Sequence, residues 1–243
     1  MKPLILLPTF NVTQEKAERA VNSLCLQSTF SFNAVVAIDG CPKSLDVYRN
    51  ICRANKLPFP LKILYREKRM KALGNIVKTL YAQDPLRISW VGIIDGDDYL
   101  YDIDAIRIMN DAYLSGASVA WSKFMWDGEP SELCNLIPPY VDPYKYPWVS
   151  SHFRTFKLDS FLSVPISNFL DSSGSFFPRC YDHALMLPQL YLCYINKSKT
   201  VFVDRFLYYY DNQDSSTPDD EHTQGSLEQS IALFIRKRGF LHR

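Results

Sequence analysis

The acidic stretch Ile93-Ile94-Asp95-Gly96-Asp97-Asp98-Tyr99 contains the residue types best suited to do chemistry. It places three carboxylates directly after Trp90 to Ile94, a short apolar run typical of a buried strand. If strand geometry continues, Asp95 and Asp97 share a face, because side chains two positions apart point the same way. Two hard oxygen ligands on one face suit Mg²⁺ or Mn²⁺. The stretch therefore predicts a metal site at Asp95 and Asp97, with Asp98 pointing away and supporting the loop.

The same residues also fit an acidic turn that leads into a helix. Its capping residue would be Asp98, Asp102 or Asp104. Residue types alone do not separate this turn from a metal site. A calcium loop of the EF-hand type is excluded, because a count from Asp95 puts Leu100 where glycine is required and Ile106 where glutamate is required.

Composition and charge exclude several classes of protein. The chain has 243 residues, 47% hydrophobic and 22% charged, which suits one large globular domain or two fused halves. No apolar run approaches the roughly 18 to 20 residues of a membrane span, so we expect a cytoplasmic protein. A net charge of +1 argues against binding nucleic acid through the overall field, although basic clusters occur at 66–71 and 236–238. The six scattered cysteines indicate neither a zinc site nor a disulfide framework.

The first half of the chain alternates apolar strands with amphipathic helices, which predicts an α/β fold with a mostly parallel sheet covered on both faces. Strands are expected at 4–7, 33–38, 61–65, 90–94 and 119–124. Helices are expected after a cap at Thr13 and at 46–54, 72–82 and 104–114. The second half is less regular: a proline-rich segment over 126–147, a helix over 182–194 that Pro188 should kink, a loop over 211–224 and a C-terminal amphipathic helix.

Three motifs in the first half resemble the family-2 glycosyltransferases of GT-A fold. They are Leu7-Pro8-Thr9-Phe10-Asn11, Ala37-Ile38-Asp39-Gly40-Cys41 and Ile94-Asp95-Gly96-Asp97-Asp98. The segments 151–157, 181–186 and 207–212 resemble a viral and bacterial branch of that family. The resemblance implies one compact GT-A domain with a Rossmann-like open mixed sheet and helices on both faces. Residues 1–124 would form its nucleotide-sugar-binding half, and residues 125–243 its irregular acceptor-binding half and C-terminal helix.

The resemblance implies inverting transfer of a sugar from a nucleotide-sugar, most often a UDP-sugar, with Mn²⁺ or Mg²⁺ as cofactor. The donor-site residues that it implies are Pro8, Thr9, Asn11, Asp39, Lys71, Asn75, Asp95, Gly96, His152 and Arg154. Asp39 would accept a hydrogen bond from the base, Asp95 would contact the ribose or a metal-bound water, and Asp97 would ligate the metal directly. Lys68, Arg69 or Lys71 would add positive charge at the diphosphate, and the sequence does not choose among them. His152 and Arg154 would contact phosphate or the acceptor.

Inversion needs a general base for the acceptor hydroxyl, and the resemblance assigns that role to Asp182. The common family pattern has a glutamate just before this aspartate, whereas Tyr181 stands there in this chain, so Asp171 is kept as the reserve. Many relatives also supply a late histidine to the metal. The third ligand stays open here, because Asn212 and Gln213 occupy that region and His222 follows farther on.

Two other functions were weighed. A sugar-phosphate nucleotidyltransferase normally carries a glycine-rich loop and a basic residue after the first strand, and Pro8-Thr9-Phe10-Asn11-Val12 has neither. A non-catalytic nucleotide-sugar-binding module would not need the intact acids. The acceptor is left as a glycan, a protein or a hydroxymethylated DNA base, and a viral chain would act in the host cytoplasm.

Overall fold

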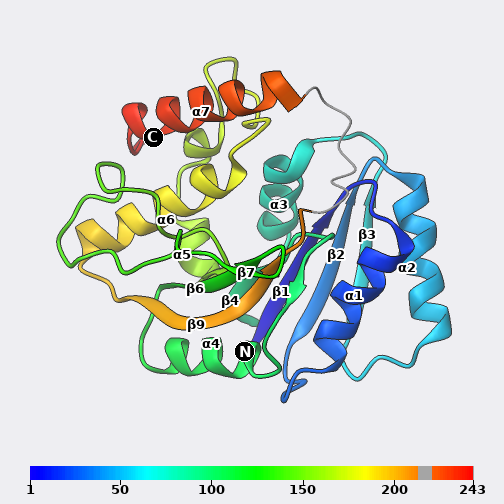
Figure 1. Ribbon diagram of the computed structural model, residues 1–243. Coiled ribbons are helices and arrows are strands. Elements are labelled where there is room, and N and C mark those ends of the chain that lie inside the picture. The colour runs from blue at the N-terminus through cyan, green and yellow to red at the C-terminus, as the bar shows by residue number, and fades with distance from the viewer. Residues whose placement is uncertain (213–220, 243) are drawn as a thin grey trace.

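The computed structural model describes the fold of residues 1–212 and 221–242, and the side chains of these residues except 221–226. The strands of this part of the chain form one curled sheet in the order β3-β2-β1-β4-β8-β6-β9-β5, with β7 paired to β6 (Figure 1). They are β1 (Lys2–Thr9), β2 (Asn33–Asp39), β3 (Leu61–Arg66), β4 (Ile88–Ile93), β5 (Tyr99–Leu100), β6 (Val119–Trp126), β7 (Glu129–Pro130), β8 (Arg154–Phe156) and β9 (Thr200–Tyr210).

Helices cover both faces of this sheet (Figure 1). They are α1 (Gln14–Cys25), α2 (Pro42–Ala54), α3 (Lys71–Tyr81), α4 (Ala105–Leu114), α5 (Leu158–Leu162), α6 (Tyr181–Asn196) and α7 (Glu221–Arg238), with a 3-10 turn at Ile166–Phe169. Helices α1 and α2 pack on one face, whereas α3 packs on β1 and β2 from the other and contacts α6. The predicted α/β fold with an open mixed sheet is confirmed.

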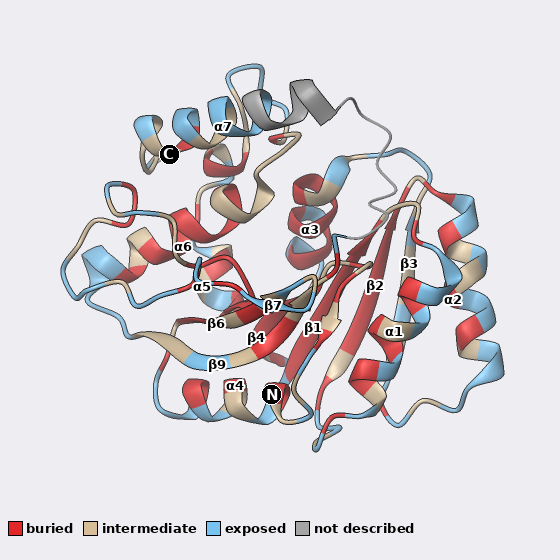
Figure 2. Cartoon of the chain, in the orientation of Figure 1, coloured by how far each residue is buried: buried red, intermediate tan, exposed pale blue. Residues whose placement is uncertain are grey.

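The first four strands are parallel, which brings their carboxyl ends to one edge of the sheet. The residues of β1, β2 and β4 are almost all buried, as the red strands of Figure 2 show, whereas β3 at the edge of the sheet is only half-buried. In a sheet that is covered on both faces, polar groups can reach a ligand only where the strands end. The motifs that follow β1, β2 and β4 therefore meet at this edge.

The second half contributes strands to the same sheet. β8 lies antiparallel between β4 and β6, and β9 runs parallel to β6. The sequence analysis assigned no strand to Thr200–Tyr210, because Asp204 and Arg205 interrupt the apolar pattern. The structure accommodates them in a bulge, where Ser122 pairs with Val203 and Lys123 already pairs with Phe206.

Element boundaries agree with the expectations to within a few residues. Thr13 caps α1 as predicted, since its hydroxyl accepts a hydrogen bond from the Lys16 amide at 3.3 Å. α2 begins at Pro42 rather than near Asp46, because proline suits the first turn of a helix. α6 continues through Pro188. The loop expected over 211–224 lies partly outside the described residues, and α7 already begins at Glu221. None of the described helices is both long and apolar enough to cross a bilayer.

Candidate functional site

A pocket of about 300 Å³ lies where β1, β2 and β4 end. Its wall contains a large part of the predicted donor site, namely Pro8, Thr9, Asp39, Lys71, Asn75, Asp95 and Asp97. Phe10, Arg69, Tyr181 and Glu228 complete much of the rest. Residues from six separated segments of the chain therefore meet in one concave site.

Asp39 ends β2 and lines this pocket. Its Oδ1 accepts a hydrogen bond from the Met70 amide at 2.7 Å, while its Oδ2 is buried and has no hydrogen-bond partner. Burial raises the pKa of Asp39, and the Met70 and Lys71 amides together with the charges of Arg69 and Arg66 oppose that rise. Asp39 is only 2% exposed, so the free oxygen is a desolvated acceptor that a ligand N–H could satisfy.

The acidic stretch is a turn rather than a continued strand. β4 ends at Ile93, and the Asp98 amide donates to the Asp95 carbonyl at 3.0 Å. The Gly96 amide donates to the Pro8 carbonyl at 3.0 Å, which ties the turn to the end of β1. A Cβ atom at Gly96 would overlap the Thr9 side chain, so only glycine allows this approach.

Asp95 is held by two side chains from the second half. Arg154 donates to Asp95 Oδ2 at 2.7 Å, and the Tyr181 hydroxyl donates to the same carboxylate. Arg154 is 2% exposed and stays outside the pocket wall. It was expected to contact phosphate or acceptor, and in the structure it instead neutralises and orients Asp95.

The two remaining acids of the turn differ in their surroundings. Asp97 lines the pocket, and burial together with the charge of Asp95 raises its pKa to about 6. Asp98 is buried beneath it, where its carboxylate accepts hydrogen bonds from the Tyr208 hydroxyl at 2.6 Å and the Asp211 amide at 2.9 Å. Burial, followed by the charges of Asp95 and Asp97, raises the pKa of Asp98. Asp98 supports the loop as predicted.

The expectation that Asp98 points away from Asp95 is wrong. Asp95, Asp98 and His152 each offer one potential ligand atom, and these atoms lie within 4.8 Å of one another. The turn curls the chain after Ile94, so the alternation of a strand no longer applies. The described residues thus contain a second possible metal-ligand set beside the predicted pair of Asp95 and Asp97.

His152 was expected at the phosphate or the acceptor, and it lies beside the acids. Its Nε2 is 4.0 Å from Asp95 Oδ2, and its Nδ1 is 2.9 Å from the Ser151 hydroxyl. Burial and the Arg154 charge lower the pKa of His152 well below its ordinary value, which keeps the ring neutral, the form that binds metals. Asn212 is exposed, while Gln213 and the side chain of His222 lie outside the described residues.

Asp182 lies in the first turn of α6, next to Tyr181 and outside the pocket wall. Its carboxylate is 3.3 Å from His183 Nδ1, and the His183 ring stacks on Trp148 at 4.0 Å. Burial alone would raise the pKa of Asp182, but the hydrogen bond and charge of His183 and the charge of Arg154 hold it below its ordinary value. The carboxylate is therefore ionised at neutral pH.

Of the three positively charged residues expected near the diphosphate, Arg69 and Lys71 border the pocket, whereas Lys68 borders only a neighbouring depression. Arg69 lies over the Phe10 ring at 3.5 Å. The reserve base Asp171 also lines that depression, and its Oδ1 is already engaged by Ser173 and Ser175. These positions separate Asp171 from the acidic turn.

The other predicted residues have structural contacts as well. Asn75 lies in the pocket wall, but its amide donates to the Ala37 carbonyl at 2.6 Å and its Oδ1 accepts from Arg66 at 2.9 Å, which fixes α3 to β2. Asn11 is outside the wall, in a left-handed conformation with φ of 50°. The sequence analysis missed Glu228, because nothing in its local pattern indicates that α7 reaches the pocket.

Comparisons with known proteins show the fold. No family model and no curated protein sequence matches the chain. The structure of S. aureus TarS 1-349 in complex with UDP-GlcNAc is 16% identical, with a TM-score of 0.60 over 97% of this chain and 66% of that one. Glucosyl-3-phosphoglycerate synthase from Mycobacterium tuberculosis, in complex with Mn²⁺, UDP and glucosyl-3-phosphoglycerate, is 13% identical, with a TM-score of 0.63 over 98% and 80%.

The chain spans only 36% of the longer S. aureus TarS chain that it also matches. The structural matches show that the chain has the GT-A-type fold of these glycosyltransferase structures, an open mixed sheet with helices on both faces. The expected fold class is confirmed.

Replacing Tyr181 by phenylalanine tests the support of Asp95. The change removes the hydroxyl that donates to Asp95 and keeps the ring, so we expect the free energy of unfolding to fall by about 1.5 to 3 kcal/mol. Urea denaturation measures this value. Tyr140→Phe is the matched control, because Tyr140 is 81% exposed and its hydroxyl has no such partner. Equal stability of Tyr181→Phe and wild type would contradict the assignment.

Proposed function

We propose that this protein transfers a sugar from a nucleotide-sugar, a UDP-sugar, to an acceptor hydroxyl with inversion at the anomeric carbon. The observation that carries the proposal is the buried, unpartnered Oδ2 of Asp39 in the pocket that also contains Asp95 and Asp97. Asp39 can accept a hydrogen bond from a nucleobase, and Asp95 and Asp97 can hold a metal ion at the diphosphate of the same nucleotide. The neighbours of similar fold, with bound UDP, UDP-GlcNAc or Mn²⁺, support this proposal.

The base is inferred from the hydrogen-bonding capacity of Asp39. Met70 already occupies Oδ1, so one acceptor is free. The single imide N–H of uracil matches one acceptor, whereas guanine presents two adjacent N–H donors and cytosine has an acceptor at the corresponding ring nitrogen. Arg69 on the Phe10 ring and Lys71 border the same pocket and provide positive charge for the diphosphate.

The metal is inferred from the crowding of carboxylates. Asp97 lines the pocket beside Asp95, and burial together with the charge of Asp95 raises its pKa. Hard oxygen donors with a neutral histidine nearby fit Mn²⁺ or Mg²⁺. We assign Asp95 and Asp97 as ligands, as the sequence predicts, and keep Asp95, Asp98 and His152, whose potential ligand atoms lie within 4.8 Å of one another, as the alternative set. When bound, the ion would neutralise charge on the leaving diphosphate.

The chain's own residues supply the rest of the reaction. Arg154 and Tyr181 hold Asp95 in place. Asp182, ionised at neutral pH, accepts the proton of the acceptor hydroxyl as it attacks the anomeric carbon. The hydrogen bond from His183 orients this carboxylate. The proposed domain organisation follows: 1–124 bind the donor, and 125–243 supply the base and the acceptor surface.

The Asp39 assignment predicts a preference among nucleotides. Wild-type protein should bind UDP more tightly than CDP in isothermal titration calorimetry, and Asp39→Asn should lose about tenfold in UDP affinity, because one amide oxygen cannot serve both Met70 and the base. Affinity for CDP should change little. Equal binding of UDP and CDP by the wild type would refute the uracil assignment.

The metal assignment predicts that Mn²⁺ strengthens UDP binding and that Asp97→Ala abolishes the increase while leaving metal-free binding intact. Because the pKa of Asp97 is about 6, the increase should be complete above pH 7 and disappear as the pH falls through about 6. The same titrations measure it. Asp159→Ala, at an exposed position, is the control. A Mn²⁺ effect that survives in Asp97→Ala would show that Asp97 is not a ligand.

The base assignment predicts that Asp182→Asn keeps UDP-sugar binding and loses transfer by about 100-fold or more. Product formation is measured by mass spectrometry under saturating donor. Asp171→Asn is the matched control and should keep full activity, because Asp171 lies in the neighbouring depression. Full activity of Asp182→Asn would remove Asp182 as the base.

A further inference from the structure

A row of aromatic rings leads away from the acidic turn along β6 and β9. We call it the aromatic ladder; its members are Phe124, Trp126, His152, Tyr208 and Tyr210. Phe124 pairs with Tyr208 in register and Trp126 with Tyr210, so these four side chains share one face of the sheet. His152 joins them at 4.7 Å from the Tyr208 ring and 5.3 Å from the Tyr210 ring.

The inner end of the ladder touches the proposed metal site. The Tyr208 hydroxyl donates to Asp98, and His152 lies 4.0 Å from Asp95. Asp182 also acts electrostatically on His152 from α6. The ladder is therefore continuous with the carboxylates on the side opposite to the Asp39 pocket residues.

The outer end of the ladder is open to solvent. Trp126 is 41% exposed, and its ring lies T-shaped to the Tyr210 ring, with the centroids 5.4 Å apart and the planes at 83°. An exposed tryptophan fixed by a neighbouring ring presents a rigid flat surface with little entropy left to lose on binding. Such a surface is suited to hold another ring beside the site.

The charges around the ladder are acidic or paired. Asp127 and Glu129 follow Trp126 at the edge of the sheet, and Glu129 has no ion-pair partner among the described residues. The nearby cations are engaged: Lys123 pairs with Asp204 at 2.5 Å, and Arg19 pairs with Asp211. This surface would repel a phosphodiester backbone.

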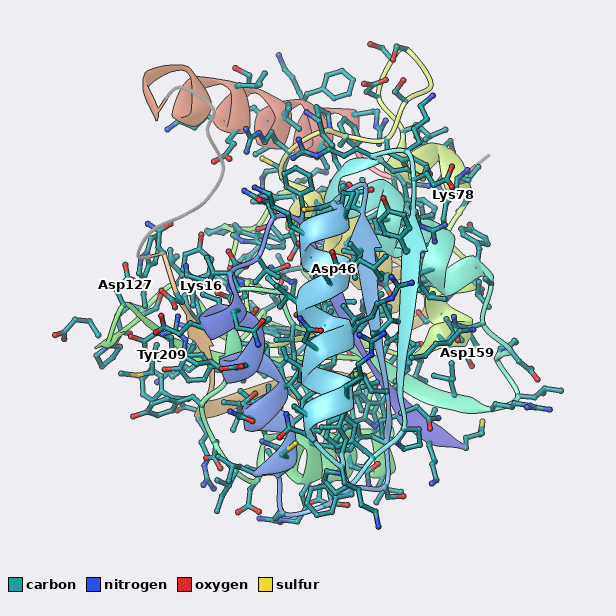
Figure 3. All side chains as sticks on the ribbon, turned by 90° about the vertical axis from the view of Figure 1, so that its right-hand side faces the viewer. Lys16, Asp46, Lys78, Asp127, Asp159 and Tyr209 are labelled. Carbon is teal, nitrogen blue, oxygen red and sulfur yellow. The ribbon has the colours of Figure 1, made fainter. Side chains whose placement is uncertain are left out.

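The basic depression lies elsewhere. Lys68, Arg69, Lys71 and Lys78 border it, and none of them forms an ion pair with a described residue. Figure 3 shows Asp127 and Tyr209 on one side of the molecule and Lys78 on the other. The cationic surface thus belongs to the donor side, and the acidic aromatic surface to the opposite side.

From this arrangement we propose that the acceptor is an uncharged sugar ring that stacks on Trp126, an inference that rests on the proposed transferase function. A pyranose has an apolar C–H face that packs on the electron-rich face of an indole, while its hydroxyl groups remain at the rim for polar contacts. In the reaction the acceptor oxygen forms a bond to the anomeric carbon, the bond from that carbon to the diphosphate breaks with its electrons leaving on UDP, and the proton passes to Asp182.

The experiment measures acceptor binding apart from donor chemistry. Saturation-transfer NMR with methyl pyranosides of glucose, galactose, mannose and N-acetylglucosamine, with UDP and Mn²⁺ present and absent, should show selective transfer to one ring face for at least one sugar. Trp126→Ala should weaken binding of that sugar about tenfold, and Trp126→Tyr should retain it to within about threefold. Tyr140→Ala is the matched control, an exposed aromatic residue away from the site, and should bind as wild type.

Transfer assays with the same variants complete the test. UDP-sugar is offered with the methyl pyranosides, a serine-containing peptide or duplex DNA with hydroxymethylcytosine. Sugar products whose formation depends on Trp126 support the proposal, and their yield should change little between 50 and 200 mM salt. Preferred transfer to DNA or peptide, or sugar binding unaffected by Trp126→Ala, overturns it. Calorimetric titration with UDP shows for each variant whether nucleotide binding is intact. The NMR experiment without nucleotide measures pyranoside binding alone, so failure of the donor site and failure of the acceptor proposal give different results.

Discussion

Three carboxylates within one turn are the constraint on which the rest of the site depends. Like charges a few ångströms apart in a poorly solvated site cannot all remain ionised without compensation. Asp95 is compensated by Arg154, and Asp98 by the Tyr208 hydroxyl and a backbone amide. Among the described residues, Asp97 receives no comparable side-chain partner, and it lines the pocket. The protein thus compensates the charges of the two inner acids itself, whereas Asp97 stays in the pocket wall.

The compensation requires the second half of the chain to enter the sheet of the first. β8 inserts antiparallel beside β4, and the register of Ile93 opposite Arg154 delivers the guanidinium to the start of the turn. β9 brings Tyr208 to the same place from more than 100 residues away. The pocket and the second half of the chain are consequently coupled through buried side chains, because a shift of β8 would release Asp95 from Arg154.

The parts of this site that the sequence predicts are those set by local pattern. Apolar runs that end in Pro8-Thr9, Asp39 and Asp95 mark parallel strands, and parallel strands must end at one edge, so their meeting in one pocket follows from topology. The contact of Arg154 with Asp95 does not follow in this way, because β8 has only three residues and its register depends on packing. The predicted direction of the Asp98 side chain is wrong for a related reason. The contact of Gly96 with Thr9 holds the chain in a turn, so the side chains no longer alternate as in a strand, and the local sequence does not indicate this contact.

Tyr181 shows how one residue type adapts the whole arrangement. A carboxylate at this position would add a fourth acid next to Asp95, whereas the phenol, whose pKa burial raises well above its ordinary value, stays neutral and donates a hydrogen bond. Arg154 then contacts Asp95 and Tyr181 together, and its charge also acts on Asp182 one residue farther along. A single buried cation therefore acts on both Asp95 and Asp182. The tyrosine allows this sharing, because it satisfies part of the Asp95 carboxylate without requiring a second positive charge in the interior.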